Sequence, residues 1–110
     1  MLDGGDCYEA AGILFMDWFP EAVLVHGYPT LQRAPWKKFG HTWVEYEVDG
    51  QTLVRDTSND RDVEMPTELY YHVGKINPDE CRRYTMTDLR HHVTETEHWG
   101  PWEREPEGAL

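Results

Sequence analysis

Cysteine is scarce in this 110-residue chain, which contains only Cys7 and Cys81. Two cysteines are too few for a disulfide framework, so we expect free thiols in a reducing compartment, with a single bridge left open as the alternative. Long apolar runs are also absent, since none approaches the roughly 18 residues that span a bilayer. The opening residues MLDGGD lack the basic and apolar regions of a secretory signal. These absences predict a cytoplasmic protein without a membrane segment.

Positive charge is in short supply as well. The chain has 10 Lys and Arg against 21 Asp and Glu, which gives a formal net charge of −11. Binding to a phosphate backbone needs clustered basic side chains, so we expect no nucleic-acid partner. An acidic surface permits a basic protein partner, although it more often serves solubility.

Internal repeats and low-complexity segments are lacking too, whereas aromatic residues are plentiful. They make up 13% of the chain and include five tryptophans, enough for a core in a domain of this size. We therefore expect one domain over residues 1–103 and a polar tail over 104–110. Trp99 or Trp102 should pack against the domain just before that tail.

An amphipathic helix is predicted over residues 6–18. Its apolar positions recur with helical spacing, at Cys7, Ala10, Ala11, Leu14, Phe15 and Trp18. Asp6 and Glu9 have the spacing of a capping box. Cys7 therefore stands in the first turn of the helix.

The clearest local signal is a hairpin over residues 41–58. Two alternating runs, HTWVEYEV and QTLVRDTS, flank Asp49 and Gly50, a pair typical of a two-residue type I′ turn. If Val48 faces Gln51, paired residue numbers sum to 99, and His41 becomes the diagonal neighbour of Asp56 on one face. The register thus predicts a His and Asp pair.

The remaining pattern completes an α+β fold. We expect further strands over 22–28, 69–73 and 80–85, and a helix over 86–98 whose capping box pairs Thr85 with Asp88. The predicted architecture is an N-terminal helix packed on a small antiparallel sheet, with a C-terminal helix. Both faces of the hairpin carry apolar residues, so both need covering.

A thiol in the first turn of a helix suggests nucleophilic chemistry. The helix dipole and the exposed N–H groups favour the thiolate of Cys7, and a nearby imidazolium would favour it further. His41 is the candidate base, and Asp56 is the candidate group that orients its ring.

The segments GDCYEA, HTWVEYEVDG and LVRDTS, in this order on a helix and two strands, resemble the transglutaminase-like superfamily of papain-fold cysteine enzymes. The resemblance covers roughly residues 4–60. It implies that Cys7 is the nucleophile, His41 the base and Asp56 the orienting acid. It also implies cleavage, deamidation or acyl transfer at an amide through a thioester, without a cofactor. Some members of the superfamily have lost catalysis.

Several features depart from that pattern. Only six residues precede Cys7, and none supplies the usual upstream oxyanion donor, so the indole of Trp36 or Trp43 is a candidate donor beside the Cys7 N–H. Asp6 and Glu9 place negative charge near the thiol, which opposes the thiolate. In so short a chain the substrate cleft must be shallow or completed by a partner protein.

Simpler interpretations exist for each residue. A cysteine on the apolar stripe of a helix is usually a small buried hydrophobe, and taken alone Cys7 would be interpreted that way. Cys81 has no candidate partners and is interpreted as structural. A strand histidine is usually structural, an aspartate near a turn usually caps a loop, and Glu45 either supports the site or faces solvent. The joint placement of Cys7, His41 and Asp56 favours the triad.

A metal site is the competing chemistry in the last helix. His91, Glu95 and His98 share one helical face and could bind a transition metal. That face points away from Leu89 and Val93, the side expected to be buried, so a solvated surface is favoured and no metal is expected.

Two classes of function follow. The first is a small cysteine enzyme that acts on a peptide or protein amide. The second is a non-catalytic acidic module that keeps the fold and binds a protein. A two-faced sheet also allows a homodimer.

Overall fold

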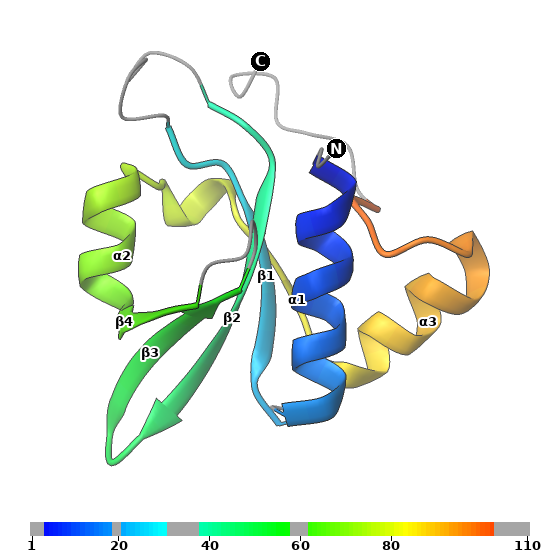
Figure 1. Cartoon of the computed structure of the whole chain (residues 1–110), viewed down its shortest axis with the longest axis horizontal. Helices are drawn as coiled ribbons and strands as arrows, with labels where there is room; N and C mark the ends of the chain where they lie inside the picture. The colour runs from blue at the N-terminus through cyan, green and yellow to red at the C-terminus, as the bar shows by residue number, and fades with distance from the viewer. Residues whose placement is uncertain (1–3, 19–20, 31–37, 58–61, 103–110) are drawn as a thin grey trace.

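The structure, a computed structural model, describes residues 4–18, 21–30, 38–57 and 62–102, and for residues 4–7 and 18 it describes the backbone only. Within these ranges the chain forms three α-helices and a five-stranded antiparallel sheet, which confirms the α+β class (Figure 1). None of the described helices is long and apolar enough to cross a membrane. The predicted polar tail, 104–110, lies outside the described residues.

The sheet has the strand order β4-β3-β2-β1-β5. The strands are β1 Val23–Gly27, β2 His41–Val48, β3 Gln51–Asp56, β4 Val63–Pro66 and β5 Arg82–Tyr84. The predicted hairpin is confirmed, with Val48 opposite Gln51. Asp49 and Gly50 have φ of 51° and 83°, the positive values that a type I′ turn requires.

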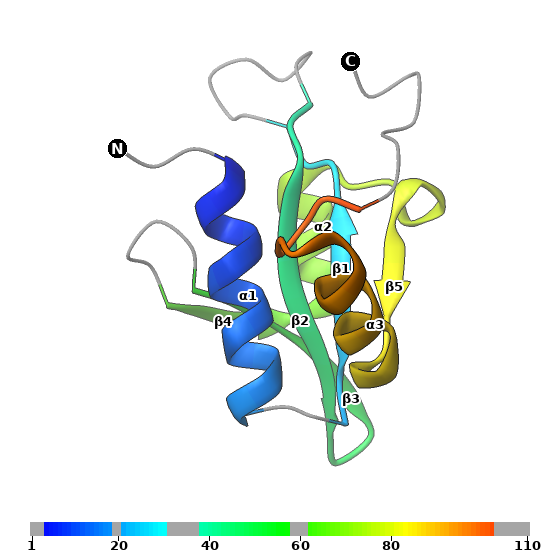
Figure 2. The ribbon, with the colours of Figure 1, turned by 90° about the vertical axis from the view of Figure 1, so that its right-hand side faces the viewer.

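Two helices cover one face of the sheet, α1 (Gly4–Trp18) and α3 (Met86–Thr96), as Figure 2 shows. The predicted helix over 6–18 is confirmed, but α1 begins two residues earlier, at Gly4. Asp6 therefore lies within the helix, and the predicted capping box of Asp6 and Glu9 is wrong. The second predicted capping box is confirmed, because Thr85 and Asp88 exchange hydrogen bonds of 2.9 and 3.2 Å. Apolar side chains from both helices and the sheet form the core on this side: Ala11, Phe15, Leu24, Val44, Tyr84 and Leu89.

Helix α2 (Thr67–Gly74) covers the opposite face (Figure 1). The predicted strand over 69–73 is therefore wrong. Pro66 precedes the first helical residue, where its fixed φ suits a helix start, and Tyr70 and Tyr71 both contact the ring of Trp43. Two adjacent aromatic residues can contact one ring from a helix, whereas neighbouring residues of a strand point to opposite faces.

The C-terminal part of the chain differs from the expectation in detail. Strand β5 lies within the predicted strand over 80–85 but is shorter than predicted, because Pro78–Glu80 form a 3-10 helix and Thr85 caps α3. Helix α3 ends at Thr96, two residues before the predicted end. Trp99 and Trp102 pack against the core, as expected.

Candidate functional site

The centre of the candidate site is a hydrogen-bonded His and Asp pair. Nε2 of His41 lies 2.8 Å from Oδ2 of Asp56. His41 is the first residue of β2 and Asp56 the last residue of β3, so the hairpin register brings the two side chains together at one end of the sheet. The predicted pairing of these two residues is confirmed. Both side chains are largely buried, with exposed fractions of 10% and 13%.

A tyrosine from α2 joins this pair. The hydroxyl of Tyr70 donates to the same Asp56 oxygen at 2.7 Å. The carboxylate therefore accepts from the hairpin and from the helix that covers it. Tyr70 lies in a segment predicted to be a strand, so its position beside Asp56 was not predicted. The two consecutive tyrosines after Leu69 were the available signal.

A pocket of about 210 Å³ opens beside the pair. His41, Asp56 and Tyr70 form its polar part. The rest is apolar and comes from β4, α2 and the flanking loops: Pro29, Phe39, Val63, Met65, Val73 and Ile76.

The candidate nucleophile, Cys7, belongs to a helix on the other face of the sheet. Cys7 lies in the first turn of α1, as predicted, and its side chain is outside the described residues. Helix α1 packs on the face formed by Leu24 and Val44, whereas His41 and Asp56 point to the face under α2. Both α1 and β2 begin at the same end of the molecule (Figures 1 and 2).

Glu45 lies on the same face of β2 as His41 and forms a network of its own. Although only 5% exposed, it accepts hydrogen bonds from Trp43 Nε1 at 2.9 Å, Tyr71 Oη at 2.5 Å and Arg83 Nη1 at 2.8 Å. The indole N–H of Trp43 is thus directed to Glu45 and away from a substrate carbonyl. Trp36, the other candidate oxyanion donor, lies outside the described residues.

Cys81 shows the features of a structural thiol. Its Sγ lies 3.7 Å from the carbonyl oxygen of Asn77. Burial raises the pKa of this thiol above its usual value, while Tyr71 and Arg83 oppose the rise. A raised pKa disfavours the thiolate, so Cys81 is a poor nucleophile at neutral pH.

The three candidate metal ligands do not form a metal site. His91 and Glu95 are exposed and 3.6 Å apart, whereas His98 lies beyond the end of α3 and accepts a hydrogen bond from the Gly100 N–H. No group of three or more potential metal ligands occurs in the part of the chain that the structure describes.

His26 is a second buried histidine, which the sequence did not single out. It belongs to β1 and is 4% exposed, among the rings of Tyr8, Tyr84 and Trp102 at centroid distances of 4.8–5.0 Å. Burial, with a smaller contribution from the charge of His92, lowers the pKa of His26 to about 3. The ring is therefore neutral at physiological pH.

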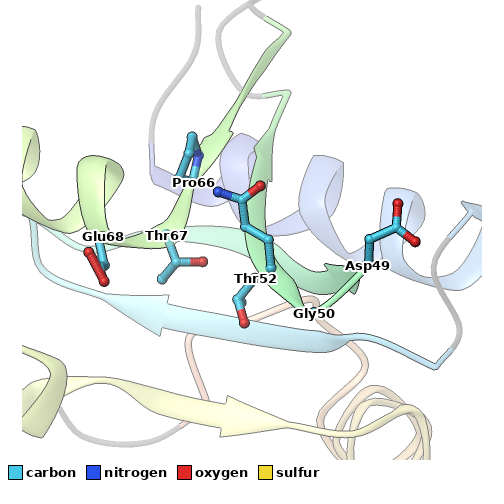
Figure 3. Close-up of a pocket in the computed structure, with 7 residues that line it drawn as sticks. Asp49, Gly50, Thr52, Pro66, Thr67 and Glu68 are labelled. Atoms are coloured by element: carbon cyan, nitrogen blue, oxygen red, sulfur yellow. The ribbon is translucent and has the colours of Figure 1, made fainter.

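A more polar hollow lies at the other end of β2, between the hairpin turn and the start of α2. Figure 3 shows the carboxylates of Asp49 and Glu68 at opposite ends of it. Two acids that stand apart offer no paired acid and base, so we place no chemistry there.

Comparison of the chain with protein families, curated proteins and solved structures finds no match. The interpretation of the site therefore depends on its own side chains.

Proposed function

We propose that this protein is a small cysteine-dependent acyl enzyme that acts on a peptide or protein amide. The observation that supports this best is the hydrogen bond between His41 Nε2 and Asp56 Oδ2. With Nε2–H donated to the carboxylate, Nδ1 is the ring nitrogen that would take a proton from a thiol. Asp56 would then fix the tautomer and stabilise the imidazolium.

The order of the elements supports a transglutaminase-like core. Cys7 belongs to the N-terminal helix, and His41 and Asp56 belong to adjacent antiparallel strands that follow it. This is the arrangement that the resemblance of GDCYEA, HTWVEYEVDG and LVRDTS implies.

The proposed reaction has two halves. In the first, the Cys7 thiol gives its proton to His41, the sulfur attacks the amide carbonyl, the C–N bond breaks, and His41 returns the proton to the leaving amine. In the second, water loses a proton to His41 and attacks the thioester, so that a C–O bond forms, the C–S bond breaks and the thiolate is reprotonated. An amine in place of water would give acyl transfer.

The geometry sets one requirement for this reaction. Because α1 and the His41 ring belong to opposite faces of the sheet, the thiol and the imidazole must meet at the sheet end where His41 begins β2. A partner protein that binds at this end of the sheet would complete the cleft.

Acyl capture tests the proposal. We expect p-nitrophenyl acetate to transfer its acetyl group to Cys7, detected by mass spectrometry of the intact protein and its peptides, and hydroxylamine to remove it. Variant Cys7→Ala should gain no acetyl group at this position, and His41→Ala should acylate at least tenfold more slowly. Acetylation of Cys81 at the same rate as Cys7 would contradict the proposal.

A non-catalytic binding module is the second candidate. The hydroxyl of Tyr70 on Asp56 favours it, because His41, Asp56 and Tyr70 satisfy one another as buried structural groups do. Under this alternative Cys7→Ala leaves every function of the protein unchanged, whereas the enzyme loses its activity.

A further inference from the structure

We propose that the pocket beside His41 is a subsite for one uncharged apolar side chain of the substrate, of leucine or phenylalanine size. This inference deepens the proposed enzyme function and rests on it. It names the class of residue next to the amide that reacts.

The size of the pocket points to a single side chain. Its volume of about 210 Å³ lies below the roughly 300–1,000 Å³ of pockets that enclose whole small molecules. The hairpin contributes His41 and Asp56 to the lining, and α2 contributes Tyr70 and Val73. Because His41 is itself part of the lining, a side chain held in the pocket lies beside the proposed base.

The chemistry of the lining points to an apolar occupant. The polar atoms at the pocket end are engaged with one another, since Asp56 Oδ2 accepts from both His41 and Tyr70. The other side chains of the lining are hydrocarbon, aromatic or thioether. An acidic side chain would meet the Asp56 carboxylate and a protein of net charge −11. A basic side chain would lose its hydration in a largely apolar lining, beside a carboxylate that already accepts two hydrogen bonds at Oδ2.

Two apolar side chains of the pocket lining are exposed to water. Phe39 is 37% exposed and Val73 is 49% exposed. A substrate side chain held between them would remove this apolar surface from water, which is favourable. Leu69 offers an internal comparison, because it lies four residues earlier on α2 with 48% exposure and does not line the pocket.

Binding of small amides to Cys7→Ala protein tests the subsite without any need for catalysis. The probes are the N-acetyl amides of glycine, leucine and lysine, and the readout is the chemical shift of the methyl groups of Val63, Met65 and Val73. We expect the leucine probe to bind about tenfold more tightly than the glycine probe, a ratio that corresponds to partial burial of one side chain. Val73→Gln should weaken leucine binding severalfold, and Leu69→Gln should not.

Three results would overturn the subsite: equal binding of leucine and glycine probes, tighter binding of the lysine probe, or equal effects of Val73→Gln and Leu69→Gln. The subsite and the enzyme fail separately. A pocket that prefers leucine in a protein whose Cys7 forms no acetyl thioester would keep the subsite and remove the enzyme. A reactive Cys7 beside a pocket with no preference would do the reverse.

Discussion

At the scale of single residues, the two neighbouring tyrosines of α2 hold two different carboxylates. Tyr70 donates to Asp56, whose side chain is 13% exposed, and Tyr71 donates to Glu45, whose side chain is 6% exposed. Tyr71 also accepts a hydrogen bond of 3.0 Å from Arg83. Burial and the adjacent Glu45 raise the pKa of Tyr71 far above its usual value, so it remains a donor at any ordinary pH.

We expect Tyr71→Phe to destabilise the protein more than Tyr70→Phe. Both hydroxyls donate to a carboxylate, and the loss of a hydrogen bond to a charged group costs about 1.5–3 kcal/mol. Glu45 is the more buried acceptor, and Tyr71→Phe also removes the oxygen that accepts from Arg83. Urea unfolding measures the free energy of unfolding of each variant. Because both variants change Tyr to Phe, each is a matched control for the other. Equal losses, or a larger loss for Tyr70→Phe, would show that the network around Glu45 contributes little.

At the scale of elements, the sequence was informative where local chemistry decides the structure. Asp49 and Gly50 specify the hairpin turn, and the turn then fixes the register that joins His41 to Asp56. The capping box at Thr85 likewise specifies the start of α3. In each case residues close in sequence make the deciding contacts.

The elements that the sequence misassigned depend on contacts between distant parts of the chain. Helix α2 has only eight residues, and its two adjacent tyrosines are residues that favour strands. The helix is stabilised by contacts of both tyrosines with Trp43, which lies far away in sequence. Strand β4 was missed because its four residues gain their hydrogen bonds from β3. The same limit applies to the site: Tyr70 and the apolar pocket wall come from these two elements.

At the scale of the whole molecule, the two helical layers divide the titratable groups between two cores. His41 and Glu45 lie under α2 among hydrogen-bond partners, whereas His26 lies under α1 and α3 among aromatic rings. The folded state therefore keeps His26 neutral, with a pKa of about 3 against 6.5 for an ordinary histidine.

We expect this difference to make the fold sensitive to acid. As the pH falls below 6.5, the unfolded chain binds a proton at His26 while the folded protein does not, which favours unfolding. The contribution of neutral His26 to stability is therefore complete above pH 6.5 and is lost progressively toward pH 3. The free energy of unfolding should fall by about 1 kcal/mol per pH unit more in the native protein than in His26→Phe. Urea unfolding between pH 6.5 and 4 measures the change in the free energy of unfolding per pH unit. A change in packing shifts this free energy equally at every pH, whereas proton binding at His26 changes its dependence on pH. Leu69→Gln, at an exposed position without a titratable group, should leave the slope as it is. A native slope no steeper than that of His26→Phe would show that His26 binds its proton equally well in the folded state.

We propose that His41, oriented by Asp56, activates the thiol of Cys7, and the rate of Cys7 alkylation measured as a function of pH is the test. Iodoacetamide labelling followed by mass spectrometry reads Cys7 and Cys81 in one sample, so that Cys81, whose pKa is raised by burial, is an internal control. We predict that the alkylation rate of Cys7 rises with an apparent pKa well below the roughly 8.5 of a free thiol. His41→Ala and Asp56→Asn should each move this apparent pKa toward that value. A Cys7 that is inert, or that keeps the same profile in His41→Ala, would contradict the account.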